Sequence, residues 1–225
     1  MSIADNIKDI KNRIAGAALK SGRKPSDITL VAVSKFVEPA RIIEAYEAGL
    51  RHFGENRMQE LAEKMQTLSG YEIHWHFIGQ LQTNKVKYID ECVFMVQSVD
   101  RVGLIEKLDE SMGKRNIKLP VLLQVNIGDE PQKGGIAEDN VVDAVQRFDE
   151  YPNLALKGLM CIPPYVGSEN ARYYFRRMRD CFNRVQDKRF PHVDMKVLSM
   201  GMSEDYEAAI EEGANMVRIG SGIFK

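Results

Sequence analysis

The chain has 225 residues, of which 44% are hydrophobic and 28% are charged. Its 31 basic residues nearly balance its 32 acidic ones, so the composition favours neither nucleic acid nor an acidic membrane surface as a partner. No run approaches the roughly 18 apolar residues of a membrane-spanning helix. The N-terminus lacks a charged region followed by an apolar core, so no signal peptide is expected.

The three cysteines, Cys92, Cys161 and Cys181, are odd in number and far apart in the sequence. This pattern fits reduced thiols in a cytoplasmic protein better than a disulfide framework. No pair of them has the spacing of zinc ligands, and His74 and His76 have no evident third ligand. We therefore expect no metal site.

Short apolar runs and helical stripes alternate along the whole chain. In chain order, the pattern predicts a helix at 3–20, a strand at 28–35, a helix at 38–48, a strand at 51–54, a helix at 56–67, a strand at 72–78, a helix at 81–89, a strand at 93–96, a helix at 101–114, a strand at 121–127, a helix at 138–149, a strand at 154–162, a helix at 168–187, a strand at 196–200, a helix at 204–212 and a strand at 215–219.

Eight strands, each but the last followed by a helix, predict right-handed β-α-β units and a parallel sheet. No Pro/Gly-rich linker divides the series. The pattern therefore indicates a single-domain (β/α)8 barrel, or TIM barrel, over residues 1–225. An open doubly wound sheet is the alternative.

Lys35 ends a strand that is apolar on both faces, with Val31 and Val33 on one face and Leu30 and Ala32 on the other. Such a strand is buried on both sides, and its carboxyl end lies where α/β barrels bind their ligands. Partial desolvation there would favour the neutral amine that forms a Schiff base. The alternative is a lysine that only extends to water.

Two loops rich in glycine and serine follow the seventh and eighth strands, the usual phosphate site of this barrel. The first contains Ser199, Gly201 and Ser203, and the second contains Gly220 and Ser221. Glycines let backbone N–H groups approach a ligand, serine hydroxyls add donors, and helix N-termini add positive potential. The alternative is a pair of turns in which Ser203 caps a helix.

A lysine beside a phosphate site fits two chemistries: a Schiff base with pyridoxal 5'-phosphate (PLP), or an aldolase acting on a phosphorylated substrate. Arg218 favours the cofactor, because a guanidinium just before the phosphate loop can face the pyridine nitrogen. An aldolase needs carboxylates for proton transfer, and the strand ends offer only Glu55 and Asp100.

Two further segments have open interpretations. The residues Lys133-Gly134-Gly135 predict either a glycine loop over the barrel mouth or a plain turn. The arginines of the 168–187 helix form either a solvated flank or a docking surface.

Several motifs together resemble the pyridoxal phosphate homeostasis proteins (the YggS/PROSC family) from residue 1 to about 224. They are Val31-Ala32-Val33-Ser34-Lys35, Gly54-Glu55-Asn56-Arg57, His76-Phe77-Ile78-Gly79-x-Leu81-Gln82-x-Asn84-Lys85, Gln124-Val125-Asn126, Lys133-x-Gly135, Gly158-Leu159-Met160, Ser199-Met200-Gly201-Met202-Ser203 and Val217-Arg218-Ile219-Gly220. Only the end departs, with Ser221-Gly222-Ile223-Phe224-Lys225 where the family has Thr-Ala-Ile-Phe-Gly.

The resemblance implies an alanine-racemase-like barrel that binds PLP as an internal aldimine on Lys35. By motif position, Arg218 matches the group facing the pyridine nitrogen and Asn56 matches a residue beside the cofactor. By motif position, Ser199, Gly220 and Ser221 match phosphate contacts, and the first loop adds Gly201 as an expected cofactor-binding residue.

The resemblance also implies a role in vitamin B6 homeostasis, in which the protein buffers PLP or delivers it to PLP-dependent apo-enzymes without turning over an amino acid. Two sequence features fit this role: the chain ends just after the eighth strand, and Arg218 would keep the pyridine nitrogen unprotonated. The alternative is a single-domain amino-acid racemase, for which no strand end supplies a convincing second base. We expect a cytoplasmic monomer with no catalytic residue.

Overall fold

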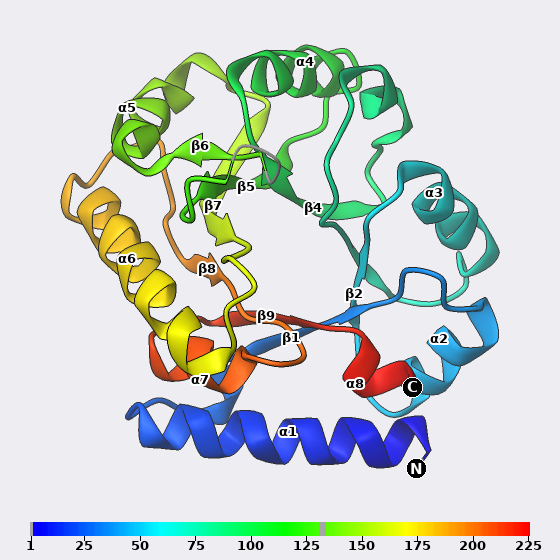
Figure 1. The fold of residues 1–225 in the computed structure, drawn as a ribbon. Coiled ribbons are helices and arrows are strands. Elements are labelled where there is room, and N and C mark those ends of the chain that lie inside the picture. The colour runs from blue at the N-terminus through cyan, green and yellow to red at the C-terminus, as the bar shows by residue number, and fades with distance from the viewer. Residues whose placement is uncertain (1, 131–133) are drawn as a thin grey trace.

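The computed structural model describes residues 2–130 and 134–225, and these form a closed barrel of parallel strands (Figure 1). The predicted (β/α)8 barrel is confirmed. Neighbouring strands follow chain order, and a pairing between the fourth and fifth closes the sheet. The eight barrel strands are β1 (Thr29–Val33), β2 (His52–Glu55), β3 (His74–Phe77), β4 (Val93–Val99), β5 (Leu119–Asn126), β7 (Leu154–Cys161), β8 (Val197–Ser199) and β9 (Met216–Ile219).

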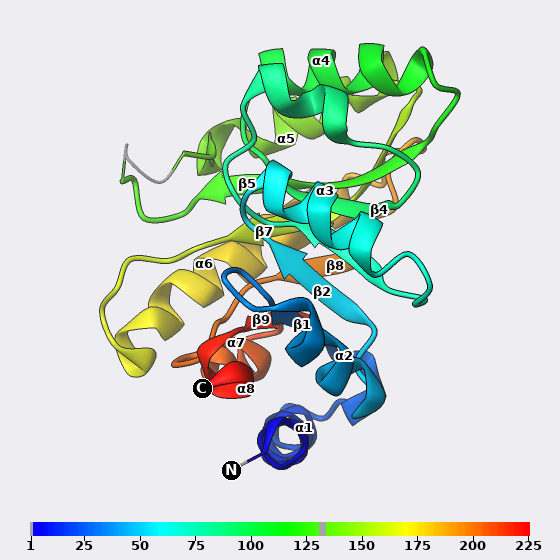
Figure 2. The same cartoon turned by 90° about the vertical axis from the view of Figure 1, so that its right-hand side faces the viewer.

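Helices surround the strands on the outside, as Figures 1 and 2 show from two directions. They are α1 (Ile3–Lys20), α2 (Pro39–Glu47), α3 (Met58–Thr67), α4 (Val102–Gly113), α5 (Val141–Gln146), α6 (Ser168–Asp187), α7 (Tyr206–Glu211) and α8 (Ser221–Phe224). The extra helix α1 buries its isoleucine stripe against α7 and α8, and Figure 2 shows it end-on outside them. No helix in the described ranges is long and apolar enough to cross a membrane.

The structure corrects two predicted helices and adds short elements. The segment predicted as a helix at 81–89 is instead a 3-10 helix, η2 (Thr83–Tyr88). Its period of three residues per turn places Val86 and the following Ile89 on the same buried side. The segment at 138–149 is broken into η4 (Glu138–Asn140), α5 and η5 (Arg147–Glu150). The unpredicted elements are η1 (Pro25–Asp27), β6 (Ile136–Ala137) and α8, which follows the last strand.

The barrel encloses a small apolar cluster and a line of polar side chains. Met95, Leu122 and Met160 pack together inside it, whereas the main apolar core lies between the strands and the helices. Arg218 and Gln97 are buried polar residues of the interior. Polar atoms at this depth need hydrogen-bond partners, and the interior supplies them from neighbouring strands.

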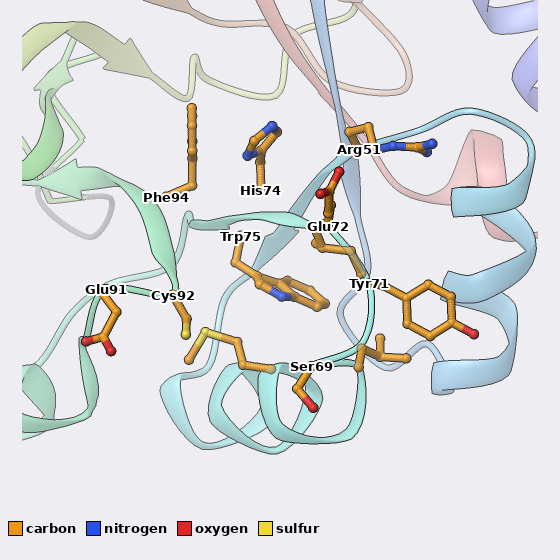
Figure 3. A pocket seen from close by; sticks show the side chains of 12 residues that line it. Arg51, Ser69, Tyr71, Glu72, His74, Trp75, Glu91, Cys92 and Phe94 are labelled. Carbon is orange, nitrogen blue, oxygen red and sulfur yellow. The ribbon is translucent and has the colours of Figure 1, made fainter.

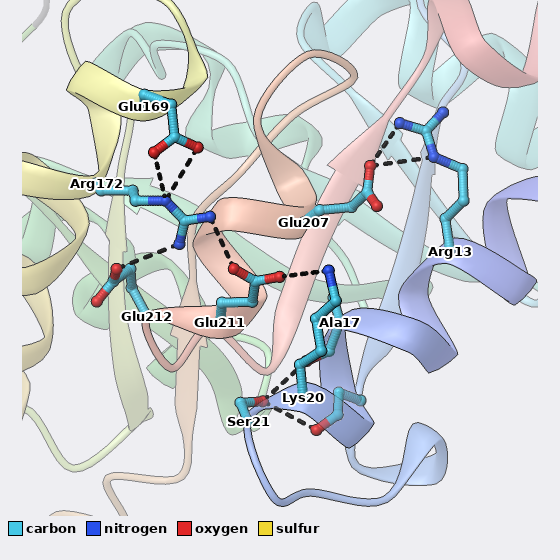
Figure 4. A network of polar contacts seen from close by, with 10 residues as sticks. Arg13, Ala17, Lys20, Ser21, Glu169, Arg172, Glu207, Glu211 and Glu212 are labelled. Atoms are coloured by element: carbon cyan, nitrogen blue, oxygen red, sulfur yellow. Dashed lines mark hydrogen bonds and ion pairs between the residues drawn. The ribbon is translucent and has the colours of Figure 1, made fainter.

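The arginines of α6 pair with acidic residues of other elements. Arg172 contacts Glu211 and Glu212 at 2.7 and 3.3 Å, and Lys20 of α1 reaches Glu211 from the other side (Figure 4). Arg177 likewise bonds Glu138. These contacts join α6 to α7 and η4, and α7 to α1, so Arg172 and Arg177 are engaged in ion pairs within the fold.

Candidate functional site

The predicted site residues meet at one end of the barrel because they follow neighbouring strands. Sheet order places β9 beside β1 and β1 beside β2. The registers pair Val31 with Arg218 and Val33 with Gly54, so the chain leaves all three strands at one rim. Lys35, Asn56 and Ser221 therefore lie on adjacent loops.

Lys35 lies in a tight turn directly after β1 and is exposed. The preceding Ser34 is completely buried, and the following Phe36 adopts a positive φ of 61°. The exposure of Lys35 differs from the partial desolvation expected from its position at a strand end. Its amine is free to meet a ligand at the rim.

A buried ion cluster holds the turn that carries Lys35. Lys64 of α3 donates to Glu55, to Glu60 and to the Ser34 carbonyl, each at 2.8 Å. Glu55 is fully buried and also accepts from the Ser34 hydroxyl at 2.7 Å. Burial raises the pKa of Glu55, and the hydrogen bonds from Lys64 and Ser34 oppose that change.

Asn56 follows β2 and carries an unused acceptor. Its Oδ1 atom is buried and has no hydrogen-bond partner within the described residues. A side chain at Gly79 would come within 2.1 Å of the Asn56 carbonyl oxygen, so the loop after β3 must pass close to it. A buried acceptor held in this way fits a residue that completes its hydrogen bonding with a ligand.

The two serine-glycine loops are joined at the rim. The Ser221 hydroxyl lies 3.1 Å from the Ser203 hydroxyl. The backbone N–H of Arg218 donates to the Gly201 carbonyl at 3.0 Å. Gly201 needs its small size because its φ is 93° and a Cβ would lie 2.5 Å from that of Ala209. The paired hydroxyls can both turn toward an oxyanion.

Helix dipoles contribute less here than the sequence pattern predicts. The helices α7 and α8 have only six and four residues, so each provides little more than one turn. Asp205, which precedes α7, accepts from the Met202 N–H, and burial raises its pKa. Hydroxyl and backbone N–H groups, not helix dipoles, are therefore the main donors at these loops.

Ser199 differs from the other predicted phosphate contacts because its hydroxyl faces the barrel interior. It is fully buried, donates to Gln97 at 2.7 Å and accepts from Arg218 at 2.6 Å. A direct phosphate contact by Ser199 remains a prediction. Ser203 is the hydroxyl that lies next to Ser221.

Arg218 begins a hydrogen-bonded line that crosses the barrel interior. Two of its N–H groups donate to Ser199 and to the Cys161 carbonyl. Because arginine only donates, Ser199 must pass its own hydrogen to Gln97. The Gln97 amide is 2.9 Å from His76 Nδ1, and His76 Nε2 is 2.9 Å from His52 Nδ1.

This direction of donation requires both histidines to be neutral. Burial lowers the pKa of His52 to about 4, with a smaller contribution from the nearby His74. Burial also lowers the pKa of His76 well below its usual range. Burial likewise lowers the pKa of Arg218. These hydrogen bonds therefore hold the Arg218 guanidinium in place through neutral side chains.

Sequence reasoning missed Gln97 and Lys64 as parts of the site. Gln97 is a polar residue within an apolar strand, which is a detectable signal because such a residue needs a buried partner. Lys64 follows Glu60 by four residues, a spacing that ordinarily indicates an exposed helix pair. Nothing in the pattern distinguishes it from a surface lysine.

The remaining candidates do not form a second site. His76 faces Gln97 while His74 stacks on Phe94, and no metal-binding cluster occurs among residues 2–130 and 134–225. Of the two aldolase carboxylates, Glu55 is bound to Lys64, and Asp100 pairs with Arg101. Gly134 and Gly135 have positive φ, and Lys133 lies outside the described residues.

A cavity of about 690 Å³ (Figure 3) lies at the opposite end of the barrel. It is lined by residues just before or at the start of β2, β3 and β4, among them Arg51, His74, Trp75, Cys92 and Phe94. Barrel ligands bind at the carboxyl ends of strands. The chemistry of the loops is therefore a better guide to the site than cavity size.

The fold and the rim loops define an alanine-racemase-like barrel, and comparison with known proteins confirms this class of protein. Residues 2–225 match the model of the family described as "Alanine racemase, N-terminal domain". An alanine racemase from Clostridium difficile 630 shares the fold, with a TM-score of 0.74 at 17% identity. The chain covers 56% of that racemase.

Full-length relatives identify the narrower group. Proteins of Aquifex aeolicus and Escherichia coli K12, both named "Pyridoxal phosphate homeostasis protein", are 41% and 40% identical and are covered over 98% and 95% of their lengths. PipY of Synechococcus elongatus, solved with PLP bound, matches over both whole chains at 30% identity and a TM-score of 0.87. The chain belongs to the pyridoxal phosphate homeostasis protein family.

Proposed function

We propose that this protein binds PLP at the rim of its barrel and holds it as a reserve for the cell. The observation that carries this proposal is the exposed amine of Lys35 on the loop beside the Ser221 hydroxyl. PLP has an aldehyde and a phosphate, which are the two groups that an amine and a hydroxyl pair recognise. The structure of PipY with PLP bound supports PLP as the ligand.

Each predicted residue has a role in this proposal. The Lys35 nitrogen attacks the aldehyde carbon, a C=N bond forms, and the carbonyl oxygen leaves as water. Ser203 and Ser221 donate to the phosphate, together with the backbone at Gly201 and Gly220. Asn56 lies beside the ring and Arg218 faces its nitrogen. Ser199 orients Arg218 and is retained as a candidate phosphate contact.

The carrier role is favoured over catalysis because two candidate proton-transfer groups, Glu55 and His76, are already engaged. Glu55 is bound by Lys64, and His76 is neutral between Gln97 and His52. A guanidinium facing the pyridine nitrogen also keeps that nitrogen unprotonated, which weakens the ring as an electron sink. The likeness to the racemase concerns the fold alone.

An assay for amino-acid turnover tests the choice between carrier and enzyme. Purified protein loaded with PLP is incubated with L-alanine and with other L-amino acids, and the D-enantiomers are measured by chiral chromatography. The carrier proposal predicts turnover far below about 1 s⁻¹, the lower range for enzymes. Turnover at or above that rate would make the protein a racemase.

Delivery is the further part of the proposal. Because Lys35 is exposed, a bound PLP is accessible to exchange with a PLP-dependent apo-enzyme. Loaded protein should restore activity to an apo-enzyme when a trap removes free PLP, and an equal amount of free PLP should not. Equal reactivation by the two sources would leave only the storage role.

We also propose that residues 1–225 act as one PLP-binding domain, as a monomer in a reducing cytoplasm. The free thiols of Cys92, Cys161 and Cys181 support the reducing compartment. Light scattering during size-exclusion chromatography tests the monomer, for which the expected mass is 25.5 kDa.

A further inference from the structure

We propose that Lys64 is a positioning residue that presents Lys35 for bond formation with the aldehyde of PLP. This inference rests on the proposed function, because it concerns the amine that forms the bond. Lys64 lies on α3 and does not reach the ligand itself. Its action passes through the backbone on both sides of Lys35.

One ammonium group holds both neighbours of Lys35. Lys64 Nζ donates directly to the carbonyl of Ser34, which precedes Lys35, at 2.8 Å. It also bonds Glu60, whose carboxylate accepts from the N–H of Phe36, the residue after Lys35, at 2.8 Å. The turn is therefore fixed at residues 34 and 36, while the side chain between them remains exposed.

The ammonium is fully satisfied by this arrangement. A lysine has three N–H donors, and Lys64 uses them on the Ser34 carbonyl, Glu55 and Glu60. The Lys64 side chain is only 7% exposed and that of Glu55 is completely buried. Removing charges from water is costly. The attraction between Lys64 and its two carboxylates offsets that cost only when their hydrogen bonds have good geometry, so these side chains are held in fixed positions.

The turn needs such a restraint because its backbone is strained. Phe36 has a φ of 61°, in a region that residues with a Cβ rarely adopt, and its ring is 70% exposed. Its ring lies 5.0 Å from the exposed Arg57 guanidinium, and such a surface contact adds little to hold the turn. Residues with strained backbones cluster at functional sites, where the surrounding contacts determine their conformation.

Two ligands separate positioning from general support of the site. PLP can bond to Lys35, whereas pyridoxamine 5'-phosphate has the same ring and phosphate but no aldehyde. For Lys64→Met, we expect the affinity for PLP to fall at least about tenfold, while the affinity for pyridoxamine 5'-phosphate changes less than about twofold. Spectral titration measures the first affinity and calorimetry the second.

A second pair of variants tests the same claim where Lys64→Met fails to fold. Glu60→Gln keeps an oxygen that accepts from the Phe36 N–H, whereas Glu60→Met removes it. The methionine variant should lose PLP affinity selectively, and the glutamine variant should retain most of it. Glu63→Met, an exposed change on the same helix, is the control and should bind both ligands as the wild type does.

Equal loss of both ligands in Lys64→Met or Glu60→Met would make the cluster a general support of the site. Unchanged binding of both would show that the turn needs no restraint. Either result overturns the inference. Failure of the wild-type protein to form any bond between PLP and Lys35 would instead refute the proposed function itself.

Discussion

Among the individual residues, the three serines near the rim have different environments and so have different expected roles. The hydroxyls of Ser203 and Ser221 lie together on the two loops, 3.1 Å apart. The Ser199 hydroxyl is enclosed between Gln97 and Arg218. Substitutions of each set therefore separate phosphate binding from the support of Arg218.

Replacing Ser203 and Ser221 together by alanine should weaken PLP binding at least about tenfold. A hydrogen bond to a charged group contributes about 1.5–3 kcal/mol, and about 1.4 kcal/mol corresponds to one factor of ten. The affinity for unphosphorylated pyridoxal should hardly change, because it presents nothing to these donors. Titration with both ligands measures the difference, and an equal loss would mean that the serines only support the loops.

Ser199→Ala should instead lower the free energy of unfolding. The change leaves the buried Gln97 carbonyl and one Arg218 N–H without a partner, at a cost of about 1–3 kcal/mol. Urea denaturation of the unliganded protein measures this loss. Unchanged stability together with a PLP-specific loss of affinity would show that Ser199 contacts the phosphate directly, as its motif predicts.

At the scale of the helices and strands, long periodic patterns could be predicted closely and short elements could not. The predicted helices at 3–20 and 168–187 have the bounds of α1 and α6, because each has a continuous buried stripe. The two-residue β6 is too short to show a period. The 3-10 helix η2 was predicted as an ordinary helix, because buried residues three apart fit both periods.

The buried contacts between elements also escape sequence reasoning, for a physical reason. Lys35, Asn56 and Arg218 could be found because they follow strands, and strand ends converge in any barrel. The Gln97 and Lys64 contacts depend on side chains from separate strands and helices meeting inside the fold. Local patterns contain no information about which of these side chains meet.

The histidines of β2 and β3 should make stability depend on pH. In the folded protein burial lowers the pKa of His52 to about 4, and that of His76 is lowered also, whereas the usual value is 6.5. Above about pH 6.5 neither the folded nor the unfolded chain protonates these histidines. As the pH falls toward about 4, only the unfolded chain binds protons, so the free energy of unfolding decreases.

Urea denaturation across that range checks this prediction, with His52→Gln as the comparison. Glutamine retains an acceptor for His76 but does not titrate, so the variant should lose less stability on acidification than the wild type. Protonation of carboxylates changes the free energy of unfolding of both proteins alike, so its contribution cancels when the two are compared. Identical pH dependence in the two proteins would contradict neutral, buried histidines.

For the molecule as a whole, the closed barrel separates support from ligand binding. The ionic contacts among α1, α6 and α7 and the apolar layer under the helices stabilise the fold away from the rim. Lys35 is exposed and lies outside the apolar core. The protein should therefore tolerate a change at Lys35, so the covalent bond to PLP can be tested without loss of the fold.

The most direct test is to locate that bond. The protein is mixed with PLP, reduced with borohydride and digested, and the modified lysine is identified by mass spectrometry. We predict a pyridoxyl group on Lys35, and we predict that Lys35→Ala loses the adduct and its visible absorbance while its melting temperature stays close to that of the wild type. An adduct on another lysine, such as Lys85, or no adduct at all would contradict the account.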